Sequence, residues 1–229
     1  MIERHPGVLV WRPRRPALAI SSGPHGGGLG VRHWVLNATV PKDYARLDPD
    51  AHVREIADDL GLRGAGTGLL TAVDVRDVVP AEDDGVRSWV TTGIGAHPTW
   101  AAAPPVDEVA PAVGTINAVC VLPVRLADAA LVNAVATVAE AKAQALAEAG
   151  VPGTGTVTDA VVLLCPADGP AEPYGGPRSA IGSALARTVH RAVHAGISLE
   201  RAGTRSSVTT SNARPTTMPG DGEDRRWPR

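Results

Sequence analysis

Two apolar runs on either side of one long helix pattern constrain the fold more than any other feature of this 229-residue sequence. The runs GTINAVCVLPV (114–124) and GTVTDAVVLLC (155–165) have the length of strands and are apolar on both faces. Such strands lie in a sheet that is covered on both sides. Between them, ALVNAVATVAEAKAQALAEAG (130–150) predicts a helix. We therefore expect a layered domain with a mostly central β-sheet packed by helices.

The helix carries one lysine where its apolar face should continue. At 100° per residue, Leu131, Val135, Val138 and Leu146 fall within an arc of about 80°, and Lys142 lies in the middle of it. In one interpretation Lys142 lies near the helix end and extends its ammonium to water. In the other the ammonium is buried, which requires a carboxylate partner or loss of its charge.

The opposite side of this helix is polar. It carries four side chains with helical spacing, namely Asn133, Thr137, Glu140 and Gln144. This stripe either faces solvent or lines a ligand cleft, and the sequence leaves both interpretations open.

Two carboxylates lie in apolar runs and are candidate partners for Lys142. Asp74 lies within LLTAVDV and Asp159 within TVTDAVVLL, where a lone carboxylate would have a large desolvation cost. Asn117, in the middle of the run 114–124, adds an amide that also needs partners. We expect a buried polar network, and structural pairing and catalytic use are both open.

Shorter elements complete the pattern. Strands are predicted at 7–11 and 17–22 around the turn RPRRP, at 33–40, and at 67–79 paired with 85–95 across PAEDD. The glycine cluster GPHGGGLG (23–30) is expected to form a loop.

Helices are predicted over 50–60, with an Asp50 cap and a Gly61 stop, and from Pro177 to Gly196. Strands in the first half and helices mainly in the second indicate an α+β class. One domain is expected over 1–202, followed by a disordered tail at 203–229, which lacks periodicity.

Composition excludes several functional classes. A formal charge of −2 argues against nucleic-acid binding, and no apolar run approaches the ~20 residues that span a bilayer. The N-terminal segment MIERHPGVLVWRPRRP is charged and interrupted by proline, so it is not a signal peptide, and we expect a cytoplasmic protein. Cys120 and Cys165 are expected to be buried, reduced thiols.

No metal or cofactor site is predicted. The run GAGTGL (64–69) lacks the third glycine of a dinucleotide fingerprint and precedes a strand. His190 and His194 have the spacing of a zinc pair but lack the glutamate between them and are expected at the surface.

A collinear set of motifs between about residue 7 and residue 200 resembles the CbiZ-type adenosylcobinamide amidohydrolases. The most specific part is N-A-x-x-T-x-x-E-A-K (133–142) followed by G-T-x-T-D-A (155–160). The matching pieces are SSGPHGGGLG (21–30), WVLNATV (34–40), GTGLLTAVDV (66–75), TTGIGA (91–96), 114–146, GTGTVTDAVVL (153–163) and YGGPRSAIG (174–182).

The resemblance implies amide hydrolysis in corrinoid salvage. Members of this family cleave the aminopropanol arm from adenosylcobinamide and leave adenosylcobyric acid, so the corrinoid is a substrate and not a cofactor. Two alternatives stay open: a corrinoid-binding protein without catalysis, and an amidohydrolase for another amide built on an N-terminal-nucleophile-like sandwich. The oligomeric state is not predicted.

Candidate roles follow from the chemistry that amide hydrolysis requires. Asp74 or Glu140 is predicted to act as the base. Lys142, with Asp159 as a possible partner, is predicted to act as electrostatic stabiliser or proton donor. Asn117 or Asn133 is predicted to donate a hydrogen bond to the oxyanion. A corrin ring is an apolar disc rimmed with carboxamides, so hydroxyl and amide groups are expected to bind it. The expected binding residues are Ser21, Ser22, Asn37, Thr115, Thr158 and Tyr174, with Trp34, Trp89 and Trp100 as possible flanks and the hydroxyls of Ser21, Ser22, Thr115 and Thr158 as possible nucleophiles.

Overall fold

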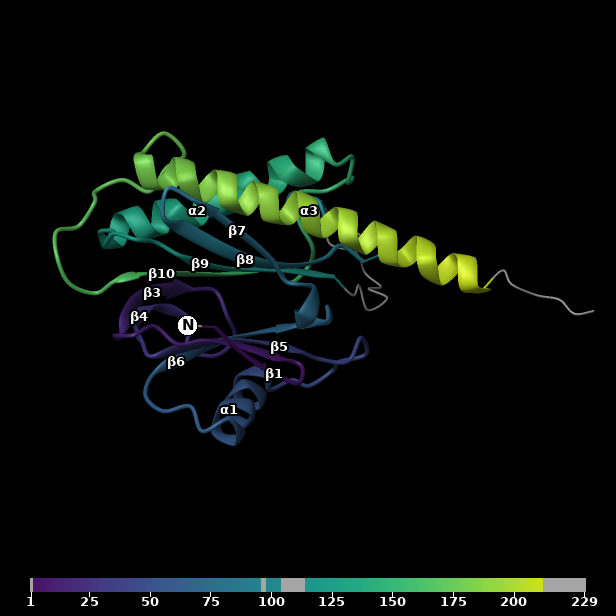
Figure 1. The fold of residues 1–229 in the computed structure, drawn as a ribbon, viewed down its shortest axis with the longest axis horizontal. Coiled ribbons are helices and arrows are strands. Elements are labelled where there is room, and N and C mark those ends of the chain that lie inside the picture. The colour runs from purple at the N-terminus through teal and green to yellow at the C-terminus, as the bar shows by residue number, and fades with distance from the viewer. Residues whose placement is uncertain (1, 96–97, 104–113, 212–229) are drawn as a thin grey trace, which may run out of the picture.

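A computed structural model describes residues 2–95, 98–103 and 114–211, and the side chains of 2–95, 98–103 and 114–202. The chain forms four layers, which are a pair of helices, a six-stranded sheet, a four-stranded sheet and a single helix (Figure 1). The elements are β1 (Ile2–His5), β2 (Val8–Trp11), β3 (Ala17–Ser21), β4 (Gly28–Arg32), β5 (Trp34–Thr39), α1 (Pro49–Asp59), β6 (Gly66–Thr71), the 3-10 helix η1 (Val75–Asp77), β7 (Val79–Asp83), β8 (Val86–Gly93), β9 (Thr115–Val121), α2 (Asp128–Glu148), β10 (Ala160–Pro166) and α3 (Ala180–Ser211).

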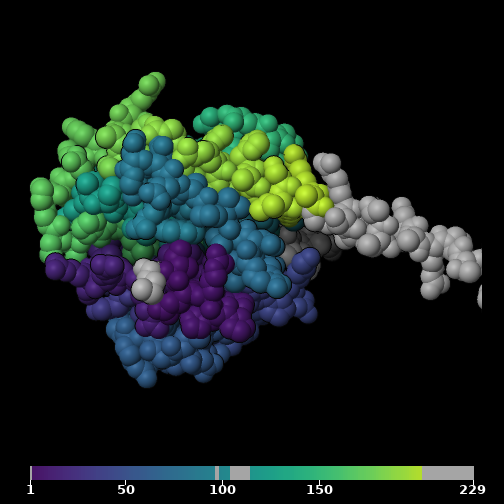
Figure 2. Space-filling view, viewed as in Figure 1, coloured from purple at the N-terminus to yellow at the C-terminus, as the bar shows by residue number. Residues whose placement is uncertain are grey.

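Each sheet contains one parallel strand pair that is joined through a helix. In the six-stranded sheet, of order β4-β3-β10-β9-β8-β7, the parallel pair is β9 and β10, and α2 connects them. In the four-stranded sheet, of order β1-β2-β5-β6, the pair is β5 and β6, and α1 connects them. All other pairs are antiparallel. The space-filling view shows the same order of layers, with the α1 side at the bottom and α2 and α3 at the top (Figure 2).

The alternation of side chains along the strands fills the three spaces between the layers. On β10, Val161 and Leu163 face the cluster under α2 and α3, whereas Val162 and Leu164 face the cluster between the sheets. On β5, Leu36 faces the third cluster, against α1. The segments 114–124 and 155–165 are apolar on both faces because both faces of this sheet are covered, as predicted. The predicted α+β layered domain is confirmed, and its strands are divided between two sheets.

Some predicted short elements differ from the structure. The strands predicted at 7–11 and 17–22 are present as β2 and β3, but β2 pairs with β1 and β5 in one sheet and β3 with β10 and β4 in the other. The end of the glycine cluster, from Gly28, is strand β4 and not loop. The predicted strand 67–79 ends at Thr71, and most of PAEDD is strand β7, which pairs with β8.

The last helix is longer than predicted. It does not end at Gly196, because α3 continues to Ser211 and thus includes residues 203–211 of the expected tail. Gly196 is needed for close packing instead. A Cβ there would lie 2.5 Å from Thr92 Oγ1, so glycine lets α3 approach β8. Residues 212–229 lie outside the described residues.

Candidate functional site

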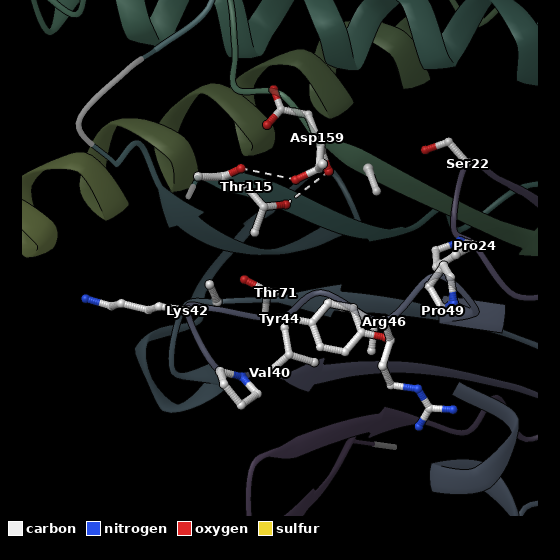
Figure 3. A pocket seen from close by; sticks show the side chains of 16 residues that line it. Ser22, Pro24, Val40, Lys42, Tyr44, Arg46, Pro49, Thr71, Thr115 and Asp159 are labelled. Atoms are coloured by element: carbon white, nitrogen blue, oxygen red, sulfur yellow. Dashed lines mark hydrogen bonds between the residues drawn. The ribbon is translucent and has the colours of Figure 1, made fainter. Parts of the chain in front are cut away.

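A cavity of about 510 Å³ opens between the two sheets (Figure 3). Thr115, Thr158 and Asp159, at the amino ends of β9 and β10, line its upper wall. Val40 and Thr71, at the carboxyl ends of the parallel strands β5 and β6, line its lower wall. Ligands of parallel sheets bind at the carboxyl ends of the strands, so the position of the lower wall favours a binding site.

Asp159 accepts more hydrogen bonds than any other side chain of this wall. Its Oδ1 accepts hydrogen bonds from Ile116 N (2.9 Å) and from the Thr156 hydroxyl, and its Oδ2 accepts from Thr156 N (3.0 Å) and Lys142 Nζ. A carboxylate offers about four acceptor positions. The four donors therefore occupy all of them and fix the carboxylate in one orientation.

Lys142 and Asp159 form an ion pair that is largely shielded from solvent. The side chains are 17% and 15% exposed, and among the described residues Asp159 is the only hydrogen-bond partner of Nζ. The position of Lys142 on the apolar arc is explained by this pair. There α2 packs against the sheet, and the ammonium reaches the start of β10. Of the two carboxylates that the sequence offers, the partner is Asp159.

Gly155 makes room for this pair. A Cβ at this position would lie 2.4 Å from Asp159 Oδ2 and 2.6 Å from Lys142 Nζ. The backbone of Gly155 is itself held, because its carbonyl accepts a hydrogen bond of 2.8 Å from Thr99 N. The sequence alone did not identify Gly155 or Thr156, and the only signal for them is the G-T-x-T-D-A motif in which they occur.

A second, smaller cavity of about 220 Å³ lies on the other face of the six-stranded sheet, under α2 and α3. Ser22, Asp159 and Ala160 line both cavities, and Lys142 lines the smaller one. The ion pair thus stands at the junction of two spaces. The hydroxyl of Ser22 is turned toward the side on which Asp159 lies (Figure 3).

Asn37 and Asn117 form part of a buried network behind the large cavity and do not line it. The Asn117 amide donates to Asn37 Oδ1 (3.0 Å) and to Leu70 O (2.9 Å), and Asn37 donates to Thr91 Oγ1 (3.2 Å). The Thr115 hydroxyl lies 3.0 Å from Asn117 Oδ1 and links the network to the cavity wall. The expected buried polar network is present, and it joins the two sheets.

Other predicted site residues lie elsewhere. Asp74 is not buried in a strand, because β6 ends before it; it caps η1 and pairs with Arg76, which lowers the pKa of its carboxyl. Of the polar stripe on α2, Asn133, Glu140 and Gln144 are exposed, and only Thr137 is buried. Ser21 is buried against Thr67 (2.8 Å).

The remaining aromatic candidates do not flank the large cavity. Tyr174 is exposed on the loop whose Gly175 contacts the first half of α2. Trp34 belongs to the core against α1, and Trp89 packs on Trp11 at 6.1 Å between ring centroids. Trp100 is exposed and follows Thr99, which pairs with Gly155.

The segment between β5 and α1 supplies cavity residues that the sequence did not reveal. Lys42, Tyr44 and Arg46 line the lower wall (Figure 3). Arg46 binds Asp48 and Glu55 and lowers the pKa of both carboxyls through its hydrogen bonds. Burial raises the pKa of Tyr44, partly opposed by Arg46. The sequence signal for this wall is Lys42, because lysine occurs only at positions 42 and 142 of the chain.

The described residues include neither a metal-binding group nor a membrane-spanning helix. Nowhere in 2–95, 98–103 or 114–202 do three or more His, Cys, Asp or Glu side chains form a group that could hold a metal ion. His190 instead pairs with Glu148 at 2.8 Å on the surface. Over the same part of the chain, no helix combines the length and apolar character needed to cross a bilayer.

Comparison with known proteins gives a consistent result. Residues 1–205 match the model of the CbiZ family, described as adenosylcobinamide amidohydrolase. A protein of that name from Methanosarcina mazei is 33% identical over 190 residues, which cover 79% of this chain and 90% of the relative. Another from Halobacterium salinarum is 33% identical over 204 residues, which cover 84% of this chain and 85% of the relative.

Proposed function

The chain belongs to the adenosylcobinamide amidohydrolase family, and from this premise we propose that it hydrolyses the amide between the aminopropanol arm and the corrinoid of adenosylcobinamide. The products are aminopropanol and adenosylcobyric acid, and the reaction serves corrinoid salvage. The expected cytoplasmic location stays a prediction.

The shape of the large cavity supports this substrate. Besides the charged side chains of Lys42, Arg46 and Asp159, its walls combine threonine and tyrosine hydroxyls with proline, valine and alanine. The hydroxyl and apolar groups suit a neutral carboxamide arm on an apolar ring. About 510 Å³ accommodates an arm and part of a ring, so the macrocycle lies across the mouth and the arm that is cleaved points toward Asp159.

The observation that carries the proposal is the ion pair at the junction of the two cavities. Because the four acceptor positions of Asp159 are occupied, it does not take a proton from water but fixes the ammonium of Lys142 in place. Lys142 keeps two N–H bonds for the reacting amide, and it donates a proton to the departing nitrogen.

Ser22 complements Lys142. Its Oγ accepts a hydrogen bond of 3.0 Å from Val161 N, and among the described residues nothing accepts its own proton. The Ser22 hydroxyl is therefore free to donate to the carbonyl oxygen as negative charge develops there. Water adds to the carbonyl carbon, the C–N bond breaks, and the nitrogen leaves with a proton from Lys142. The proton that the water loses restores Lys142.

The test is incubation of purified protein with adenosylcobinamide and measurement of both products by mass spectrometry. Lys142→Met should lower turnover by about 10²–10³-fold, the usual effect of removing one transition-state donor. Arg63→Met, which removes a cation from an exposed position after α1, is the matched control and should keep full turnover. Corrinoid binding without aminopropanol release would instead support the non-catalytic alternative.

The proposal includes independence from metal ions and cofactors. The assigned proton transfer and oxyanion contact use only side chains of this chain. Turnover should therefore be the same after dialysis against a chelator, and loss of turnover that zinc or another divalent ion restores would contradict this part of the proposal.

A further inference from the structure

The smaller cavity is not explained by binding of the corrinoid ring. It lies under α2 and α3, on the far side of the six-stranded sheet from the large cavity. Both cavities share Ser22 and Asp159, so a group that is attached at this junction can extend into either space.

The lining of the smaller cavity is polar at one end and apolar elsewhere. Ser22, Lys142 and Asp159 are its polar residues. The rest consists of valine, alanine and isoleucine side chains, among them Val135 and Ala139 of α2. Such a site suits a short aliphatic group that carries its polar atoms at the end nearest the ion pair.

The volume sets an upper limit on the occupant. About 220 Å³ corresponds to about seven times the share of one liquid water molecule. A three-carbon amino alcohol, with five non-hydrogen atoms, fits this space, whereas a corrin ring does not.

We propose that the smaller cavity binds the short amino-alcohol leaving group and sets the leaving-group specificity of the enzyme. This inference rests on the proposed function. The amide lies at the junction, with its acyl side in the large cavity and its nitrogen side in the small one. After water adds and the C–N bond breaks, Lys142 supplies the proton that the nitrogen takes, and the proton lost by the water restores Lys142.

The binding test uses N-(2-hydroxypropyl)acetamide, a neutral fragment with the same amide and leaving group. Ala139→Leu should fill the smaller cavity from its rim and weaken binding at least about tenfold, as measured by ligand-observed NMR, because added methylenes occupy the pocket. Ala136→Leu is the matched control: it lies one turn earlier on α2, is exposed, and is not among the residues that line the cavity. Equal binding by unchanged protein and Ala139→Leu would overturn the inference.

The kinetic test compares two corrinoid amides, one bearing aminopropanol and one with an unsubstituted carboxamide. Ala139→Leu should lower kcat/KM for the aminopropanol amide about tenfold more than for the unsubstituted amide. An equal loss for both would contradict a leaving-group pocket. Fragment binding that depends on Ala139 without any hydrolysis of adenosylcobinamide would reject the proposed function and leave the pocket assignment standing.

Discussion

Asn117 on β9 donates a hydrogen bond of 3.0 Å to Asn37 on β5, and this contact joins the two sheets directly behind the large cavity. Both side chains are buried, and Asn117 also holds the carbonyl of Leu70, which lines the cavity. The pair therefore sets the distance between the cavity walls, although neither residue reaches the ligand space.

Replacing Asn117 by alanine should destabilise the fold. The change leaves Asn37 Oδ1 and Leu70 O without this donor, at a cost of about 1–3 kcal/mol for each buried polar group left unpaired. The free energy of unfolding in urea measures the effect. Asn133→Ala removes the same amide from the exposed side of α2 and should change stability little, so equal effects of the two variants would contradict this role.

The sequence predicted the local elements better than their partners. The strands β9 and β10 and the helix α2 have clear apolar patterns, because burial on both faces determines their composition. The division into two sheets could not be predicted, since β2 and β3 look like a hairpin and pair instead with strands distant in sequence.

The site was predicted in part for the same reason. The position of Lys142 on the apolar arc left open whether its ammonium is buried or extends to water. Asp74 and Asp159 both lie in apolar runs, and choosing between them as partner needs the end of β6 at Thr71. The segment that contains Tyr44 and Arg46 has no periodic sequence pattern. Its residues line the cavity only because the two sheets lie face to face.

Lys142 and Asp159 should be energetically coupled. Asp159→Asn leaves the ammonium without its counter-charge, and Lys142→Met leaves the carboxylate with uncharged donors only. In a double-mutant cycle the two losses of unfolding free energy should exceed the loss in the double variant by about 1–3 kcal/mol. Additive losses would show that the pair contributes nothing to the stability of this site.

Gly155→Ala should lower activity more than stability. The φ of Gly155 is not in the left-handed region, so the backbone tolerates alanine, but the new Cβ would displace the ion pair. We expect at least about a tenfold loss of kcat/KM, since an ångström of misplacement in a site costs up to about 10²-fold.

Gly61→Ala is a suitable control for Gly155→Ala. It is strained at φ +63° but has open space around the added Cβ, so it should lower the melting temperature without changing kcat/KM. Full activity of folded Gly155→Ala would contradict the need for close packing at the ion pair.

Stability should fall at alkaline pH in part through Cys120. Burial raises the pKa of this thiol to about 12, with a smaller opposing effect from the Ser88 hydroxyl. Between pH 9 and 12 the unfolded chain releases this proton and the folded chain keeps it, so stability is lost as pH rises, by up to about 1.4 kcal/mol per pH unit. Cys120→Ala should have a shallower slope between pH 9.5 and 11 in urea unfolding, and parallel curves would contradict this assignment.

Ser22→Ala distinguishes the two chemical roles that a hydroxyl at the junction can have. As an oxyanion donor, Ser22 should be worth about 10²–10³-fold in kcat, whereas loss of a serine nucleophile costs up to about 10⁶-fold. The two roles differ in what accumulates, since only a nucleophile forms an acyl-enzyme that hydroxylamine captures as a hydroxamate. Because Ser22 Oγ accepts from Val161 N and no described base contacts it, we expect no hydroxamate beyond the background of Ser22→Ala.

Thr158→Val is the control for Ser22→Ala. It removes a hydroxyl that lines the large cavity alone, so it should raise KM with little change in kcat. An acyl group found on Ser22 by peptide mass spectrometry would overturn the donor role and establish a covalent route.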